Sequence, residues 1–61
     1  MAYWLNNGKR YEVKFERDRI TVTEFSPMFD GAFYSETDVI SLDNFKEVRE
    51  YLTEKNGGIE V

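Results

Sequence analysis

The sequence contains no cysteine and no histidine among its 61 residues, and these two absences remove several classes of function. Without cysteine the chain forms no disulfide and offers no thiolate to a metal ion. Without histidine it lacks the side chain that most often serves as a general base or as a neutral metal ligand. Nucleophile pairs of the Ser–His and Cys–His kind are therefore excluded. We expect a protein that is not an enzyme, with no catalytic residues and no cofactor.

Long apolar runs are also missing, and the chain has a single proline. Apolar stretches stay far below the ~20 residues that a helix needs to span a bilayer. Residues 1–5 show neither the basic nor the apolar region of a secretory signal. These features predict a cytosolic protein without a membrane segment. The carboxylates of Asp30, Glu36 and Asp38 do not have the spacing of a calcium loop, so we expect no metal site.

Aromatic residues are abundant, at 16% of the chain, and apolar residues make up 41%. Each large aromatic side chain buries ~150–250 Å² when it is packed, which helps a short chain to build a core. This content argues against intrinsic disorder. We therefore predict one small domain over residues 1–61.

The first half of the chain has the alternation of β-strands. Residues 11–16 place Tyr, Val and Phe on one face and charged side chains on the other. The Asn7-Gly8 pair is a hairpin turn signal and joins this strand to a shorter one at residues 3–5. Residues 20–25 are rich in β-branched side chains and follow a polar turn at 16–19. Phe25 falls on the face opposite Ile20 and Val22, unless a bulge redirects it.

The middle of the chain combines a loop signal with short extended segments. Pro27 and Gly31 predict a loop over residues 26–31. Residues 32–35 and 39–40 are expected to be extended, with a turn or a bulge at 36–38. The pattern does not distinguish one bent strand from two short ones.

The last third predicts a helix from Ser41 to Lys55, with Ser41 as its N-cap. Its apolar face consists of Leu42, Phe45, Val48 and Leu52. Residues 56–58 contain two glycines and end the helix. Residues 59–61 either fold back onto the helix or add a short strand.

Together these elements predict an α+β fold. A small antiparallel sheet of three to five strands, built from β-hairpins, is followed by one C-terminal amphipathic helix that packs on one face. Such a sheet has an uncovered face and two free edges, so we expect a protein partner or a homo-oligomer.

The net charge is −4, and the acidic surplus lies in the second half of the chain. An acidic surface selects a basic partner, and large apolar side chains near a turn are typical interface anchors. Phe29 and Phe33 either complete the core or serve as such anchors. The predicted partner-binding residues are Met28, Phe29, Asp30, Phe33, Tyr34, Glu36, Asp38, Glu47, Glu50 and Glu54. The leading hypothesis is a small regulator or inhibitor, of the kind that phages encode, which masks a basic or nucleic-acid-binding surface of its target.

A second hypothesis is a single-stranded nucleic-acid-binding protein that uses Arg10, Tyr11 and Lys14. Aromatic side chains on a sheet stack on bases, and cations follow the phosphates. The net negative charge disfavours it, because affinity for nucleic acid depends strongly on counterion release.

Residues 9–52 resemble the positive-cofactor-four family of transcriptional coactivators, which are dimeric single-stranded DNA-binding proteins. The similarity lies in Lys9-Arg10-Tyr11, in residues 20–25, in Asp30-Gly31 and in Ile40-Ser41-Leu42. The segment 33–38 is acidic where the family has a basic, glycine-containing stretch, and the helix aromatic, Phe45, comes earlier. The resemblance therefore implies the fold and the dimer more than it implies DNA binding.

Overall fold

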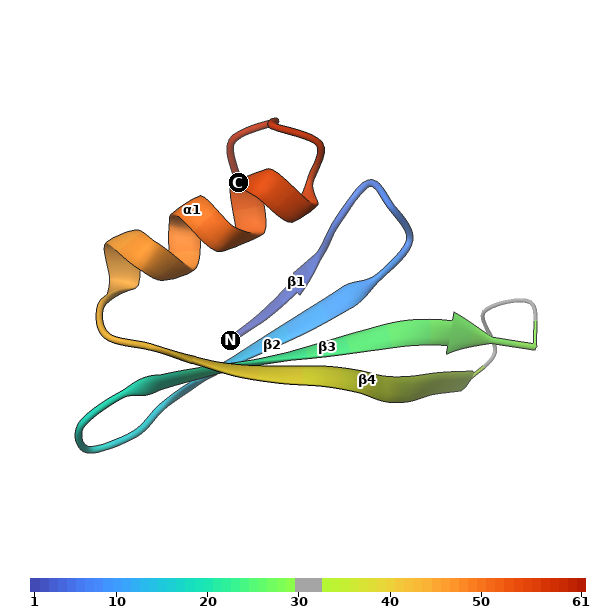
Figure 1. Ribbon diagram of the computed structural model, residues 1–61. Helices are drawn as coiled ribbons and strands as arrows, with labels where there is room; N and C mark the ends of the chain where they lie inside the picture. The colour runs from blue at the N-terminus through green and yellow to red at the C-terminus, as the bar shows by residue number, and fades with distance from the viewer. Residues whose placement is uncertain (30–32) are drawn as a thin grey trace.

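The computed structural model describes residues 1–29 and 33–61, which form a four-stranded antiparallel sheet and one helix (Figure 1). The elements are β1 (Ala2–Trp4), β2 (Arg10–Phe15), β3 (Ile20–Met28), β4 (Phe33–Leu42) and α1 (Phe45–Lys55). The strands lie in chain order, so each strand pairs with its neighbours in the sequence. The helix lies across one face of the sheet and leaves the other uncovered. The predicted α+β class and the single C-terminal helix are confirmed.

The β1–β2 hairpin forms where Asn7-Gly8 predicts it. Gly8 has φ +83°, a conformation that few residues other than glycine adopt. Its N–H donates to the Leu5 carbonyl over 3.1 Å. The Asn7 side-chain oxygen accepts from the Lys9 N–H over 2.9 Å and closes the turn.

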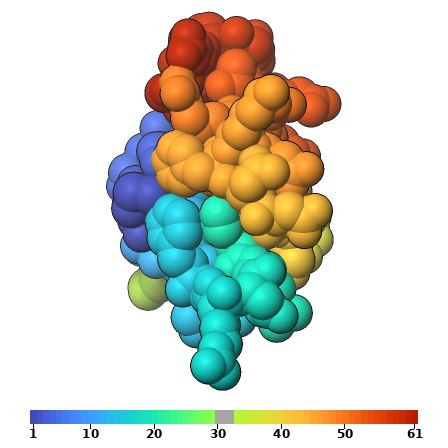
Figure 2. All heavy atoms as spheres, turned by 90° about the vertical axis from the view of Figure 1, so that its left-hand side faces the viewer, coloured from blue at the N-terminus to red at the C-terminus, as the bar shows by residue number. Residues whose placement is uncertain are grey.

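The core lies between the sheet and α1. Its fully or nearly fully buried members are Leu5, Tyr11, Val13, Ile20, Val22, Val48 and Leu52. The buried strand residues follow the alternation of the sequence. Val13 pairs with Val22 of β3, and Val22 pairs with Ile40 of β4, so the three side chains lie on the same face of the sheet. At the end seen in Figure 2, helix residues (orange) lie above the strands and the β2–β3 turn (teal) projects below. Phe15 and Phe45 stack in this end region with ring centroids 6.1 Å apart.

The helix begins at Phe45, not at Ser41, and its N-cap is Asn44. Ser41 and Leu42 instead continue β4, because they pair with Thr21 and Ile20 of β3. The side-chain oxygen of Asn44 accepts from the Glu47 N–H over 3.0 Å. The prediction of a Ser41 cap was wrong because a good capping residue also fits a strand when a paired strand continues past it.

The predicted loop at 26–31 is also wrong over its first residues, since β3 continues to Met28. Pro27 pairs with Tyr34 of β4. Pairing between β2 and β3 ends at Phe25, so the side of β3 that faces β2 is free beyond this point. A proline, which lacks an N–H, is tolerated at such an edge. Asp30 and Gly31 lie outside the described residues.

The segment that the sequence left open is one strand, β4, with an irregularity in its middle. Glu24 pairs with Asp38, but the next residue of β3, Phe25, pairs with Glu36. Thr37 is therefore the extra residue of a β-bulge.

The C-terminal residues do not form a strand. Gly57 and Gly58 have φ +73° and +87°, and the chain turns back at the end of α1. Glu60 pairs with Arg49 over 2.6 Å, and Val61 packs against the core. The alternative in which residues 59–61 fold back onto the helix is therefore the one observed.

Candidate interaction surfaces

The far ends of β3 and β4 form an arm that projects beyond the rest of the sheet (Figure 1). Phe29 and Phe33 at this end are 74% and 66% exposed, and Met28 is 40% exposed. The two phenylalanine rings contact each other edge to face, with centroids 6.3 Å apart, within the range of about 4.5–7 Å that is typical of such pairs. Phe29 has φ +49°, which is uncommon for a residue other than glycine. Of the two alternatives for these residues, exposure is the one that the fold adopts.

The bulge at Thr37 decides which face each arm residue occupies. Side chains alternate along a strand, so one extra residue reverses the alternation beyond it. Asp38 lies on the face that carries α1, as does its partner Glu24. Glu36 pairs with Phe25 and lies on the opposite, uncovered face, which we call the open face. Tyr34, two residues further, lies on the open face as well.

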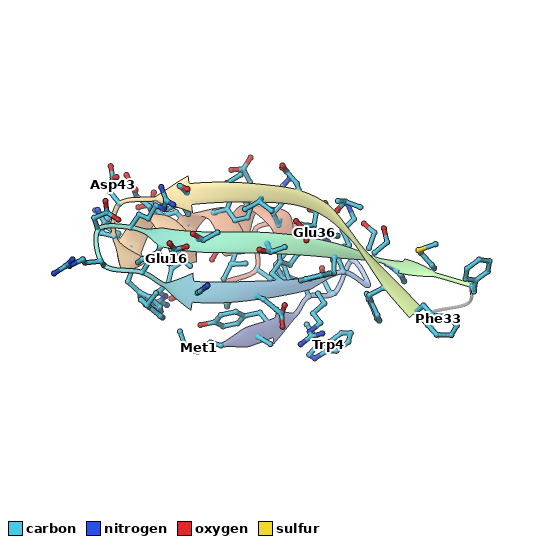
Figure 3. All side chains as sticks on the ribbon, turned by 90° about the horizontal axis from the view of Figure 1, so that it is seen from below. Met1, Trp4, Glu16, Phe33, Glu36 and Asp43 are labelled. Carbon is cyan, nitrogen blue, oxygen red and sulfur yellow. The ribbon has the colours of Figure 1, made fainter. Side chains whose placement is uncertain are left out.

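An aromatic cluster with a cation at its centre occupies this end of the open face. Trp4 of β1 meets Tyr34 of β4 edge to face, with ring centroids 5.1 Å apart. The Arg10 guanidinium lies between them in the sheet, 5.6 Å from the Trp4 ring and 5.8 Å from the Phe25 ring. Figure 3, which views the open face, shows the twisted end of β4 running toward the side of the sheet where Trp4 is labelled. The twist therefore brings the two outer strands into contact.

Arg10 is only partly satisfied in this cluster. Its Nη2 donates to Glu12 Oε1 over 2.7 Å. Its Nε is buried and has no hydrogen-bond partner among the described residues. Trp4 remains 63% exposed beside it. The cluster thus keeps an accessible aromatic surface.

The predicted nucleic-acid trio is divided by the sheet. Arg10 and Lys14 lie on the open face, but Tyr11 is fully buried on the face that carries α1. The Tyr11 ring packs edge to face against Tyr51, with centroids 6.1 Å apart. The prediction that Tyr11 stacks on bases was therefore wrong. The aromatic side chains that share a face with Arg10 are Trp4, Phe25 and Tyr34, which the prediction did not assign to this role.

A buried carboxylate, Glu24, lies on the covered face, and the sequence prediction did not single it out. It accepts the Tyr11 hydroxyl over 2.7 Å and the Thr37 hydroxyl over 2.8 Å. Lys9 Nζ lies 3.5 Å from the same carboxylate. The Tyr11 hydrogen bond is the main cause that lowers the pKa of Glu24, against an opposing effect of burial. Burial, and next the Glu24 hydrogen bond, raises the pKa of Tyr11 to about 12.

Three of the predicted acidic residues lie along one side of the molecule, between β4 and α1. Asp38 and Glu54 are close enough to Tyr51 that, after burial, their charges and that of Glu24 raise its pKa. Glu47 lies on the same helix stripe, four residues before Tyr51 and seven before Glu54. We call Asp38, Glu47 and Glu54 the acidic flank. Lys55 adjoins it, with Nζ 5.4 Å from the Tyr51 ring.

The remaining predicted residues do not join this flank. Glu36 and Tyr34 belong to the open face, and Met28, Phe29 and Phe33 belong to the arm. Glu50 borders a shallow groove along α1, which Glu54 of the acidic flank also lines and where Lys46, Arg49 and Glu60 give lining charges of both signs. Asp30 lies outside the described residues. The ten predicted positions thus form separate surfaces instead of one site.

The ion pairs of the described residues leave the acidic flank unneutralised. The pairs are Lys9–Glu24, Arg10–Glu12, Arg19–Glu16 and Arg49–Glu60. None of them includes Asp38, Glu47 or Glu54. Within residues 1–29 and 33–61, no three acidic side chains come close enough to hold a metal ion. The helix of this part of the chain is too short and too polar to cross a membrane.

Comparison with known protein families, curated proteins and solved structures found no significant match. The resemblance to the positive-cofactor-four family therefore stays a prediction.

Proposed function

We propose that this protein is a non-enzymatic binding module that holds a basic protein partner through the acidic flank, with the apolar arm as a second contact. The observation that carries the proposal is the set of carboxylates at Asp38, Glu47 and Glu54, which have no ion-pair partner among the described residues. Asp38 and Glu47 each accept one backbone N–H, from Val39 and Asp43, but no cation in the described part of the chain pairs with these carboxylates, so their charge is available to a partner of opposite sign. Charge complementarity of this kind steers association and selects the partner.

The arm supports the same proposal. Its Phe29, Phe33 and Met28 side chains are exposed although the protein is small and has a core elsewhere. Aromatic residues and methionine are enriched at the buried centres of interfaces. A partner with an apolar pocket beside basic residues fits both surfaces. A regulator or inhibitor that masks a basic surface of its target would act in this way.

Matched charge reversals test the electrostatic part. Glu54→Lys changes the flank, and Glu36→Lys makes the same change on the open face of the sheet. We expect a fluorescently labelled lysine-rich peptide to bind the unmodified protein at low salt and to bind more weakly as salt is added. Glu54→Lys should weaken this binding about tenfold, a loss that corresponds to ~1.4 kcal/mol, and Glu36→Lys much less. Equal losses in the two variants would show that the flank is not the binding surface.

The second candidate is single-stranded nucleic-acid binding on the open face. It is favoured by the cluster in which Trp4 and Tyr34 lie on the same face as Arg10 and Lys14. Exposed aromatic side chains next to cations suit base stacking and phosphate contact. The Glu12 and Glu36 carboxylates on this face oppose it.

Anisotropy of a labelled single-stranded oligonucleotide distinguishes the two candidates. Binding on the open face predicts a salt-dependent signal that is lost in Arg10→Ala and Lys14→Ala and weakened in Trp4→Ala. A protein-binding module predicts no such signal at low salt. Sedimentation equilibrium of the same samples tests the predicted homo-oligomer, in which two copies would pack through the uncovered sheet face.

A further inference from the structure

The two edges of the sheet differ in length. β1 contributes an edge of three residues, whereas β4 contributes one of ten residues. β4 pairs with β3 only, since it is the last strand in the sheet order. In residues 1–29 and 33–61, no other strand takes up the backbone donors and acceptors on the outer side of β4. Such a row is the template that a further strand requires.

One contact shows which way this backbone is oriented. The Val39 N–H donates to the Asp38 side chain over 2.9 Å, so it is directed away from β3. Because backbone groups alternate along an antiparallel strand, the Ser41 N–H lies on the same outer side. The pairing of Val39 to Leu42 with β3 is regular, with the bulge behind it. This part of β4 is a regularly paired edge with outward donors at two positions.

The side chains next to this edge differ in character on the two faces. On the covered face, Asp38 is followed along β4 by Ile40 and Leu42, which pack against the core. The helix stripe with Glu47 and Glu54 lies on the same side of the sheet. On the open face, Val39 is 47% exposed and Ser41 lies beside it. A strand added along β4 would thus place every second side chain on the face that carries the acidic flank, directly beside Asp38 at one end of the edge, and the others next to a small apolar surface.

We propose that the outer edge of β4 accepts an extended, basic segment of a partner protein as a fifth strand, with Lys or Arg at alternate positions facing the acidic flank. This inference rests on the proposed function and specifies how the partner is held. Main-chain hydrogen bonds supply affinity in this mode of recognition, and alternate side chains supply specificity.

The charges on β4 select such a partner over a second copy of the chain. Antiparallel pairing of two β4 edges in the register centred on Asp38 would place the two Asp38 carboxylates opposite each other on the covered face. Like charges across a strand pair are destabilising. The Asp38 carboxylate also accepts a hydrogen bond from the Val39 N–H in the free protein. When a partner carbonyl takes that N–H, the carboxylate is released to pair with a partner cation.

The test uses labelled peptides of equal length and composition, with binding measured by fluorescence anisotropy. One peptide alternates Lys and Val, and a second has the same residues in two blocks. Two further versions of the alternating peptide carry N-methyl groups on one or the other alternate set of amides. We expect the alternating peptide to bind more tightly than the block peptide. One N-methylated version should bind about tenfold more weakly, since it loses its edge hydrogen bonds, and the other within about twofold of the parent.

A variant of the protein makes the complementary change. Ser41→Pro removes the outward N–H, and Ser41→Ala is its matched control. We expect Ser41→Pro to weaken binding of the alternating peptide and Ser41→Ala to leave it unchanged. Circular dichroism checks that the proline variant keeps its fold, and if it unfolds the N-methylated peptides decide the matter alone.

The outcomes separate this inference from the function on which it rests. If all Lys-containing peptides bind equally, and N-methylation on either set has no effect, strand addition is wrong while the basic-partner proposal stands. If none of them binds at low salt, both are wrong. Preference for one N-methylated version together with sensitivity to Ser41→Pro supports strand addition.

Discussion

Each face of the sheet holds a charged side chain that is at least partly buried, and the two differ in how far their hydrogen-bonding groups are satisfied. On the covered face the Glu24 carboxylate has two hydroxyl donors and a lysine. On the open face the Arg10 guanidinium has one carboxylate, two aromatic rings and a buried Nε without a partner among the described residues. The covered face is a closed hydrogen-bonded network, whereas the open face keeps unsatisfied capacity. A fully satisfied polar network contributes to a unique fold.

The largest expected difference between the faces lies in apolar packing. Leu52→Ala leaves a cavity beneath α1 at a side chain that is only 1% exposed, and we expect it to lower the free energy of unfolding by about 2–5 kcal/mol. Val39→Ala on the open face removes a side chain that is 47% exposed, and its cost should stay within about 0.5 kcal/mol. Urea unfolding of both variants measures the contrast. Similar losses would mean that the open face is packed against something in solution.

The second comparison concerns the two charges themselves. Glu24→Gln keeps the shape of the side chain but places an amide where both oxygens accept hydroxyls, so we expect a loss of about 1–3 kcal/mol. The pKa of Glu24 is lowered in the fold, so its stabilising effect is present above the ordinary value of 4.5 and is lost as the pH falls below it. The gap between wild type and variant should therefore shrink in acid. A gap that is constant with pH would exclude a charged Glu24 as the cause.

Arg10→Gln is the matching change on the open face. It removes a partly exposed ion pair and the contacts with the Trp4 and Phe25 rings. Such contacts contribute about 0.5–1 kcal/mol at accessible sites, so the loss should be smaller than for Glu24→Gln. Trp4 fluorescence reports the local change, and urea unfolding reports the stability. A loss larger than that of Glu24→Gln would reverse the comparison between the faces.

The last difference concerns the Tyr11 hydroxyl of the covered face, whose contribution to stability changes with pH only in the alkaline range. Its pKa is raised from 10.0 to about 12, so the protein should lose stability as the pH rises through this interval. Tyr11→Phe should reduce this alkaline loss and leave the part that comes from Tyr51, whose pKa is also raised. It should cost about 1 kcal/mol near neutral pH, because the hydrogen bond to Glu24 is missing. Ultraviolet absorbance of the phenolate follows the titration. A Tyr11→Phe variant with an unchanged alkaline loss would assign that loss to another group.

Much of the fold could be predicted because local patterns and pairing agree. The alternation of residues 11–16 and the Asn7-Gly8 turn each specify their structure over a few residues. The helix start was missed because Ser41 suits both an N-cap and an edge strand, and only its pairing with Thr21 decides between them. The extension of β3 through Pro27 depends on where β2 ends, which no local signal shows.

The candidate surfaces were less accessible to sequence reasoning. Tyr11 has the opposite parity to Arg10 and Lys14, so alternation alone already separates it from them. Glu24 shares the parity of Ile20 and Val22, and a carboxylate at such a position is a signal of a buried network. The contact between Trp4 and Tyr34 had no such signal, because it depends on the twist of the whole sheet.

The bulge at Thr37 also determines which changes in chain length the protein can accept. Because Thr37 has no partner of its own on β3, its removal leaves Asp38 opposite Glu24 and Glu36 opposite Phe25. A deletion at this position would preserve every other cross-strand pair and cost chiefly the hydroxyl that Glu24 accepts and the local twist. A deletion one residue to either side would instead move the Thr37 hydroxyl away from the Glu24 carboxylate. A sequence that lacks this one residue would therefore keep every other side chain of the ten-residue strand on the same face of the sheet.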